Sequence, residues 1–253
     1  MSLTPDGARY LAMRYERVAR PFHLRWLVPL LCGTDRLRWE VASRGAVVVL
    51  AGLAWWYTGS PWMAVCALLP GVWFNWSHPV LVDAPAMTVA LLAACVWPVC
   101  WPAAVILAVV AGCIRETAPV WAAIYAWHPL LLVGLVPVAV RWLMRAGTDP
   151  VGYDDALAHP VRYARRAHAG RWLDPFLMVT PWGPLVLGLA APTPQLGLAL
   201  AAGYGQLAVA TDSVRLYQWA WPVLAAACVT VAPEWLPLVA LGVAFNPWKG
   251  DGL

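Results

Sequence analysis

Arg115 and Glu116 stand side by side in an otherwise uncharged part of the chain. No Asp, Glu, Lys or Arg occurs in Ala84–Ile114 before the pair or in Thr117–Val140 after it. In a bilayer, such charges cost kilocalories unless they face protein, water or a charged ligand. Adjacent helical residues point about 100° apart, so each side chain needs its own partner. An anionic lipid phosphate suits Arg115, and a sugar hydroxyl or an arginine suits Glu116; the alternative is a structural ion pair between helices.

Two ionisable side chains near the N-terminus could reach the same site. Asp6 could act as a general base, or as a carboxylate that activates an acceptor with the help of a metal ion. Arg25 could hold a phosphate in a two-pronged, hydrogen-bonded fork. The structural alternatives are a surface acid in a frayed terminus for Asp6 and a contact with lipid headgroups for Arg25.

Four further residues complete the candidate site. Asp83 opens an Asp-Ala-Pro segment typical of a helix start, so it is either a site carboxylate or a plain helix cap. His78 lies shortly before it and could bind a metal ion, although one histidine with one acid is a weak metal motif. Asp212 and Arg215 either pair along one helix face or bring Arg215 into the pocket of Arg115.

The composition is typical of a membrane protein, because 62% of the residues are hydrophobic and 12% are charged, whereas soluble domains are near a quarter charged. Five uncharged segments exceed the roughly seventeen residues that begin to suggest a membrane span. We therefore predict an all-α fold, a polytopic transmembrane helical bundle. The five segments are Gly45–Val82, Ala84–Ile114, Thr117–Val140, Pro175–Thr211 and Leu216–Pro233.

Prolines and glycines divide these segments into shorter helices joined by turns. Half of a segment, about fifteen residues long, crosses only about 22 Å, which is short for a bilayer but acceptable inside a bundle. We expect about eight to ten short spans. The predicted turns are Gly59–Pro61, Trp97–Pro102, Trp127–Pro129, Pro192–Pro194 and a last one near Ala232–Glu234.

The whole chain, residues 1–253, is predicted to form a single membrane domain. Residues 1–44 interleave basic and apolar side chains, which is typical of amphipathic helices that lie in the membrane interface. Transmembrane helices are expected in residues 45–140 and 175–248, with a polar external loop at 141–174 between them. If every uncharged segment is a hairpin, the charged residues between them emerge on one membrane face.

Several classes of function have no support in the sequence. The net charge of +4 comes from arginine with a single lysine, and basic residues beside apolar spans meet lipid headgroups more often than nucleic acid. The six cysteines form no CxxC motif and are expected to pack as small apolar residues. No HExxH, GxSxG, P-loop or dinucleotide-binding motif occurs. The polar N-terminus lacks the apolar stretch of a cleavable signal peptide.

The order of short motifs resembles that of a known family of membrane enzymes. In chain order the motifs are DGxxY from Asp6, PFHxRxLxPL from Pro21, DxP from Asp83, RETA from Arg115, and DxxR from Asp212 followed by WPVL from Trp221. This order is similar to that of the bacterial integral-membrane glycosyltransferases of the C-type superfamily, which use polyprenyl-phosphate sugars as donors. The resemblance covers residues 5–225.

The resemblance implies transfer of a hexosyl or pentosyl group from a polyprenyl phosphate to an acceptor hydroxyl. The site would face the extracytoplasmic side of a bacterial plasma membrane, and the acceptor would be a glycan, a lipid or a protein. A divalent cation, Mg²⁺ or Mn²⁺, is the cofactor left open. Arranged by expected role, the site residues are Asp6 and Asp83 for catalysis, Arg25, Arg115 and Arg215 for the donor phosphate, and Glu116, Asp212 and His78 for substrate binding.

The chain departs from that family in two respects, and two other functions stay open. No first transmembrane helix is expected before Gly45, so the resemblance is to a shortened form, and the chain is short for the family. A transporter or flippase of a lipid-linked anion would use the same charges along a path, but transporters often carry repeated halves and none is visible. A non-catalytic membrane assembly protein would use Arg115 and Glu116 as a clasp between helices.

Overall fold

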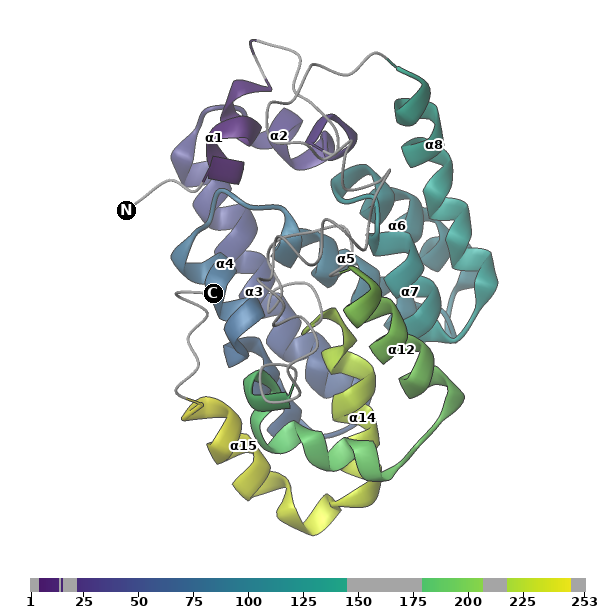
Figure 1. Cartoon of the computed structure of the whole chain (residues 1–253). Helices are drawn as coiled ribbons and strands as arrows, with labels where there is room; N and C mark the ends of the chain where they lie inside the picture. The colour runs from purple at the N-terminus through teal and green to yellow at the C-terminus, as the bar shows by residue number, and fades with distance from the viewer. Residues whose placement is uncertain (1–4, 14, 16–21, 145–178, 207–217, 247–253) are drawn as a thin grey trace. The chain divides into compact units, whose positions relative to one another are not determined.

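The computed structural model describes residues 5–13, 15, 22–144, 179–206 and 218–246, and all regular secondary structure in this described part is helical (Figure 1). The prediction of an all-α fold is therefore confirmed. Contacts divide the chain into two compact units. Unit 1 comprises residues 1–53 and 75–151, and unit 2 comprises residues 54–74 and 152–253. The single domain expected from the sequence stays a prediction.

Unit 1 is built around a group of short apolar helices that follow one another in the chain. Helix α5 packs on α6 and α7, and the 3-10 helix η3 packs on α6 and α7 in turn. Glycines let backbones meet here, since a Cβ at Gly134 would collide with the carbonyl oxygen of Ala108. In chain order the helices are α1 (Pro5–Ala12), η1 (Phe22–Leu24), α2 (Leu27–Cys32), α3 (Arg36–Thr58, in this unit to Leu53), α5 (Asp83–Val96), α6 (Trp101–Ile114), α7 (Ala118–Ala126), η3 (Pro129–Leu135) and α8 (Val136–Leu143).

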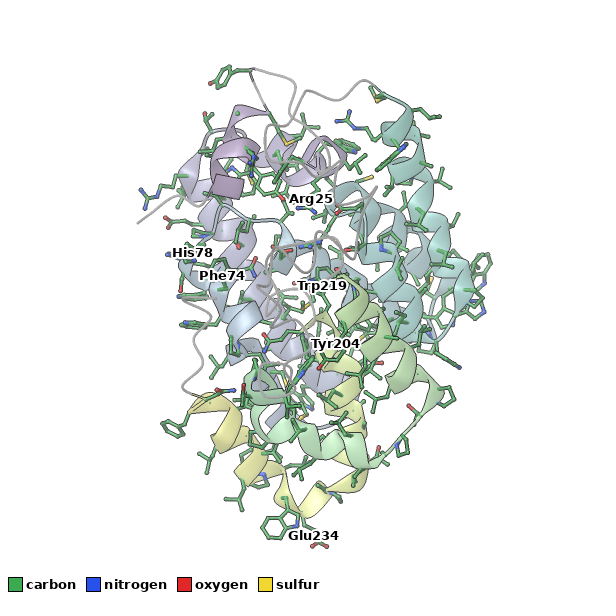
Figure 2. All side chains as sticks on the ribbon, in the orientation of Figure 1. Arg25, Phe74, His78, Tyr204, Trp219 and Glu234 are labelled. Atoms are coloured by element: carbon green, nitrogen blue, oxygen red, sulfur yellow. The ribbon has the colours of Figure 1, made fainter. Side chains whose placement is uncertain are left out.

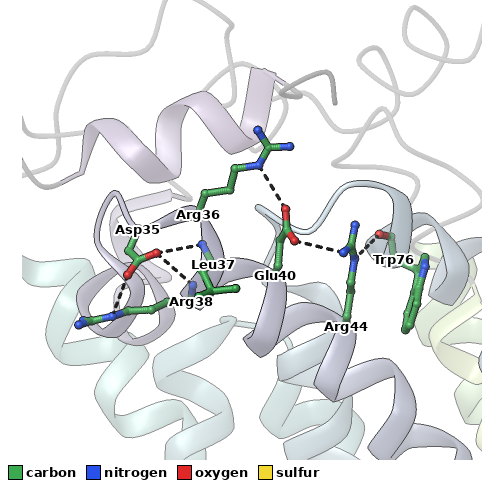
Figure 3. Close-up of polar contacts among 7 residues, drawn as sticks. All are labelled: Asp35, Arg36, Leu37, Arg38, Glu40, Arg44 and Trp76. Atoms are coloured by element: carbon green, nitrogen blue, oxygen red, sulfur yellow. Dashed lines mark hydrogen bonds and ion pairs between the residues drawn. The ribbon is translucent and has the colours of Figure 1, made fainter.

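Helix α3 joins the end of the segment expected to be interfacial to the first uncharged segment. It begins at Arg36 and continues past Gly45, so it includes charged residues of the expected interfacial segment. The Asp35 carboxylate accepts the N–H groups of Leu37 and Arg38 at 2.9 and 3.3 Å, which satisfies backbone donors at the helix start (Figure 3). Glu40 then pairs with the arginines one turn before and after it, Arg36 and Arg44.

Unit 2 contains several 3-10 helices held by two amide side chains. Helix α14 packs on η5 and α12, and α15 packs on η2 and η5. Gln218 accepts the N–H of Gly71 and donates to the Pro181 carbonyl at 2.9 Å, while Asn246 donates to the carbonyl oxygens of Thr180 and Pro181. The helices are η2 (Pro61–Leu68), α4 (Pro70–Ser77, in this unit to Phe74), η5 (Thr180–Ala190), α12 (Pro194–Gly205), η7 (Gln218–Ala220), α14 (Trp221–Val231), η8 (Pro233–Trp235) and α15 (Leu236–Ala244).

The turns predicted from proline and glycine are confirmed. Gly59, with φ at +71°, separates α3 from η2. Trp127, with φ at +52°, ends α7 before Pro129 begins η3. Breaks between helices also occur at the other three predicted turns, which follow Val96, Ala190 and Val231. These positions were predictable because proline interrupts helical hydrogen bonding and glycine tolerates positive φ.

Few of the described helices are long enough to cross a bilayer alone. By length and composition, α3 is the one that qualifies, with a second if Gln218–Val231 and Pro233–Ala244, bent by 107° at their junction, count as one span. Helices α5 and α6 and the segment Pro129–Leu143 are apolar but shorter.

Candidate functional site

The connection between α6 and α7 places Arg115 and Glu116. Helix α6 ends at Ile114, and Arg115 adopts an extended backbone with φ at −149° and ψ at 133°. Pro119 lies in the first turn of α7, where the missing N–H and fixed φ of proline favour a new helix start. The side chains of Arg115 and Glu116 consequently reach different partners. This agrees with the prediction that each of them requires a partner of its own.

Glu116 is bound by Arg25, which lies between η1 and α2. The guanidinium donates through Nε to Oε2 at 2.7 Å and through Nη2 to Oε1 at 2.6 Å, so the pairing is two-pronged. Its Nη1 donates to the hydroxyl of Tyr10 in α1 at 3.0 Å, and the Phe22 ring lies 5.6 Å from the guanidinium carbon. The Arg25 and Glu116 side chains are 11% and 19% exposed. This pair ties α1 and the segment before α2 to the α6–α7 connection.

Arg115 is bound by Asp83, which lies in the first turn of α5. The two side chains form an ion pair, and each is only 5% exposed. Asp83 is the acid in the first turn of α5, and Val82 occupies the position before it. The amide oxygen of Asn75 accepts the N–H of Ala84 at 3.1 Å. The Asp83 carboxylate thus compensates the buried charge of Arg115.

Arg25 and Glu116, the more exposed of the two ion pairs, keep each other ionised. Burial opposes ionisation of Glu116, but the charge and hydrogen bonds of Arg25, together with the charge of Arg115, outweigh it and lower the pKa of Glu116 to about 2. Burial likewise opposes the charge on Arg25, yet Glu116 and Tyr10 raise its pKa well above the ordinary value. The pair therefore remains charged throughout the neutral range.

The remaining predicted site residues lie outside this cluster or outside the described residues. Asp6 belongs to α1, one turn before Tyr10, but its side chain is not among those described. Arg215 and Asp212 lie outside the described residues altogether. His78 follows α4, and Figure 2 places it away from Arg25. Within the described ranges no group of three His, Cys, Asp or Glu residues could hold a metal ion.

Tyr10 and Asn75 were not singled out from the sequence as contributors to this cluster. Tyr10 closes the DGxxY motif and lies one helical turn after Asp6, which is the signal that could have linked it to the site. Asn75 is buried and carries no such signal, because its role depends on the approach of α5 to the end of α4.

Comparison of the chain with protein-family models, with curated proteins and with solved structures finds no match in any of the three. The resemblance to C-type glycosyltransferases therefore rests on the sequence motifs.

Proposed function

We propose that this protein is a membrane glycosyltransferase that moves a sugar from a polyprenyl phosphate to an acceptor hydroxyl. One observation carries the proposal: charged residues from three distant segments meet in a single cluster. Arg25 binds Glu116, Asp83 binds Arg115, and Tyr10 fixes α1 to the same cluster. The motifs that led to the family resemblance thus include residues that pack together in unit 1.

The distribution of side chains in unit 1 supports insertion of its short helices in a membrane. Asp83 begins α5 and Arg115 follows α6, so the charges lie at one end of this helix pair. At the other end Trp97 stacks on His128 at 4.1 Å, and Trp101 and Trp127 are exposed. Tryptophan favours the membrane–water interface, and 14-residue helices span about 21 Å between the two ends.

The outer surface of the same helices is suited to lipid. Large aliphatic side chains on α6 and α8 are exposed, among them Ile106, Val136 and Val140. An exposed apolar surface of this kind marks a contact with a membrane or a partner. Together with the interfacial tryptophans it favours a polytopic bundle over a water-exposed one.

The two ion pairs are proposed to have different roles. The Asp83–Arg115 pair is almost completely buried and holds α5 against the α6–α7 connection. Arg25 and Glu116 are more exposed, and the fork that Arg25 offers to a carboxylate also fits a phosphate. In the described arrangement each arginine is neutralised by an acid, so a donor phosphate must displace Glu116 to bind Arg25. Asp6, on the helix that Arg25 holds through Tyr10, would accept the proton of the acceptor hydroxyl.

The decisive experiment compares Asp6→Asn with the unaltered protein in a transfer assay with a short-chain polyprenyl-phosphate sugar. General-base catalysis contributes about 10²- to 10⁴-fold, so transfer should fall by that factor while the melting temperature stays unchanged. Glu234→Gln, which removes an exposed acid in unit 2, is the matched control and should retain full transfer. Full activity of Asp6→Asn would remove the proposed mechanism.

A second candidate function, a non-catalytic membrane assembly protein, is favoured by the pairing itself. Both described arginines expected at the donor phosphate are bound by carboxylates, as a clasp between helices requires. The double variant Arg25→Glu with Glu116→Arg separates the two functions. If the Arg25–Glu116 pair only holds helices together, the double variant should keep the stability and the assembly of the unaltered protein. If Arg25 binds the donor phosphate, the double variant should keep the stability of the unaltered protein but lose sugar transfer.

A further inference from the structure

Unit 1 contains a cavity distinct from the charged cluster. Its volume is about 870 Å³. Side chains from α2, from the start of α3 and from the end of α8 line it, including Trp26, Leu30, Leu31, Asp35, Arg38 and Arg141. This volume lies in the range of small-molecule sites, about 300–1,000 Å³.

The polar part of the lining offers hydrogen-bond donors to an anion. Among the described residues that line the cavity, Arg38 and Arg141 supply guanidinium groups and Asp35 supplies a carboxylate. The indole N–H of Trp26 is buried and has no acceptor among the described residues, which is costly unless a ligand supplies one. The Arg141 guanidinium carbon lies 5.9 Å from the Trp26 ring centre, so these donors are neighbours.

Asp35 does not prevent an anion from binding Arg38. The two side chains pair at 3.2 Å but are 48% and 67% exposed, and exposed pairs contribute little. Asp35 is also held by the backbone N–H groups of Leu37 and Arg38. Arg38 can therefore turn to a ligand while Asp35 stays at the start of α3.

The apolar part of the lining would accommodate a hydrocarbon chain. Leu30 and Leu31 line the cavity although they are 69% and 63% exposed. Leu143, at the end of α8 shortly after Arg141, is exposed as well. A ligand that combines one anionic group with an adjoining apolar chain satisfies both parts of the lining.

We propose that this cavity binds the phosphate headgroup of an anionic lipid, with the phosphate at Arg38, Arg141 and the Trp26 N–H and the chain along Leu30 and Leu31. Arginine matches phosphate geometry through its planar fork. The site is separate from the one assigned above to the sugar donor, and the proposal does not depend on sugar transfer.

The test measures binding of dioctanoyl phosphatidic acid to the full chain in detergent, by native mass spectrometry and calorimetry. The variant Arg38→Gln with Arg141→Gln should weaken binding at least about tenfold, because hydrogen bonds to charged groups are the strong ones. Trp26→Phe keeps the ring but loses the N–H, and should weaken binding about two- to tenfold. Arg36→Gln is the matched control, since Arg36 pairs with Glu40 outside the cavity, and should bind as the unaltered protein does.

Four results would overturn the proposal. Unchanged binding by the double glutamine variant would exclude the cavity, as would equal weakening by Arg36→Gln. Equal binding of dioctanoylglycerol, which lacks the phosphate, would show that the cavity does not recognise the phosphate group. Equal affinity for inorganic phosphate would assign the site to free phosphate instead of a lipid. Replacing both arginines by lysine should retain part of the affinity, and Asp6→Asn should bind the probe normally, which separates this test from that of the transferase.

Discussion

The two units differ in the charge of their buried polar groups. In unit 1 Asp83 and Arg115 are buried as ions, and Arg25 and Glu116 are partly buried beside them. The buried polar side chains in the described part of unit 2 are neutral, namely Ser60, Gln218 and Asn246. Unit 1 thus joins distant segments through ion pairs as well as through neutral side chains such as Ser43 and Asn75, whereas the described part of unit 2 joins its segments through neutral side chains, chiefly the amides of Gln218 and Asn246.

The difference follows from what each set of side chains has to satisfy. In unit 2 the amides bond to backbone groups at irregular starts and ends of helices, such as the N–H of Gly71 and the carbonyl of Pro181. Such groups would be costly if left unsatisfied. The ions of unit 1 bond to each other, and an apolar pair of similar volume is often as stable as a buried ion pair. A charged cluster of this kind is therefore a better candidate for function than the amides are.

The largest effect is expected from removing one charge of the deepest pair. Asp83→Asn leaves Arg115 charged and buried, which should reduce the free energy of unfolding by about 3–5 kcal/mol. Thermal unfolding in detergent measures the loss, and hydrogen exchange should locate it in peptides of α5 to α7. The double variant Asp83→Leu with Arg115→Met should recover most of the stability. Faster exchange in α14 and α15 alone would contradict the contrast between the units.

The next effect is a pH dependence confined to unit 1. The pKa of Glu116 is lowered from its ordinary 4.5 to about 2, so its stabilising contribution is complete above pH 4.5 and declines as the pH falls toward 2. A shift of this size corresponds to about 3 kcal/mol. Melting temperatures between pH 2 and 7 should show this decline in the unaltered protein and lose it in Glu116→Gln. An identical acid profile for both proteins would show that Glu116 does not titrate as described.

The sequence predicted the helical class and the turns because both depend on local properties. Proline, glycine and long uncharged segments determine where helices can start and stop. The start of α3 also had a local signal, namely the alternating charges of Asp35, Arg36, Glu40 and Arg44. The apolar residues between these charges suggested an interfacial segment instead.

Partner choice within the site could be predicted only in part. The isolation of Arg115 and Glu116 in the sequence indicated that each needs its own partner, and an arginine was one expected partner for Glu116. That this arginine is Arg25, and that Asp83 binds Arg115, depends on how distant segments fold together, which the spacing of residues does not encode. The division into two units could not be seen either, because the sequence of α3 runs through the boundary without a linker.

A smaller effect is expected from the neutral network of unit 2. Gln218→Leu removes one donor and one acceptor from a buried site, and should reduce the free energy of unfolding by about 1–3 kcal/mol. Hydrogen exchange should increase around η5 and α4 and stay unchanged around Glu116. Because no charge is lost, the effect should be the same at pH 4 and pH 7. A pH-dependent loss would mean that the two units differ less than their polar groups indicate.

The smallest effects are expected from glycine replacements. In both units, glycines allow close contact between backbones. Gly134 in unit 1 and Gly188 in unit 2 each face a backbone carbonyl that a Cβ would strike, those of Ala108 and Leu224. Replacement of either by alanine should destabilise by about 1–3 kcal/mol, since rigid backbone must move.

Gly197, inside α12, has open space around its Cβ position and serves as the matched site. Gly197→Ala should stabilise by about 0.4–1 kcal/mol, because alanine lowers the entropy of the unfolded chain and favours helix. Melting temperatures of the three alanine variants provide the measurement. If Gly134→Ala and Gly188→Ala also stabilise, close backbone contact is not what holds η3 on α6 or η5 on α14. In that case the ion pairs of unit 1 and the amides of unit 2 must position these helices, and the contrast between the units extends to their packing.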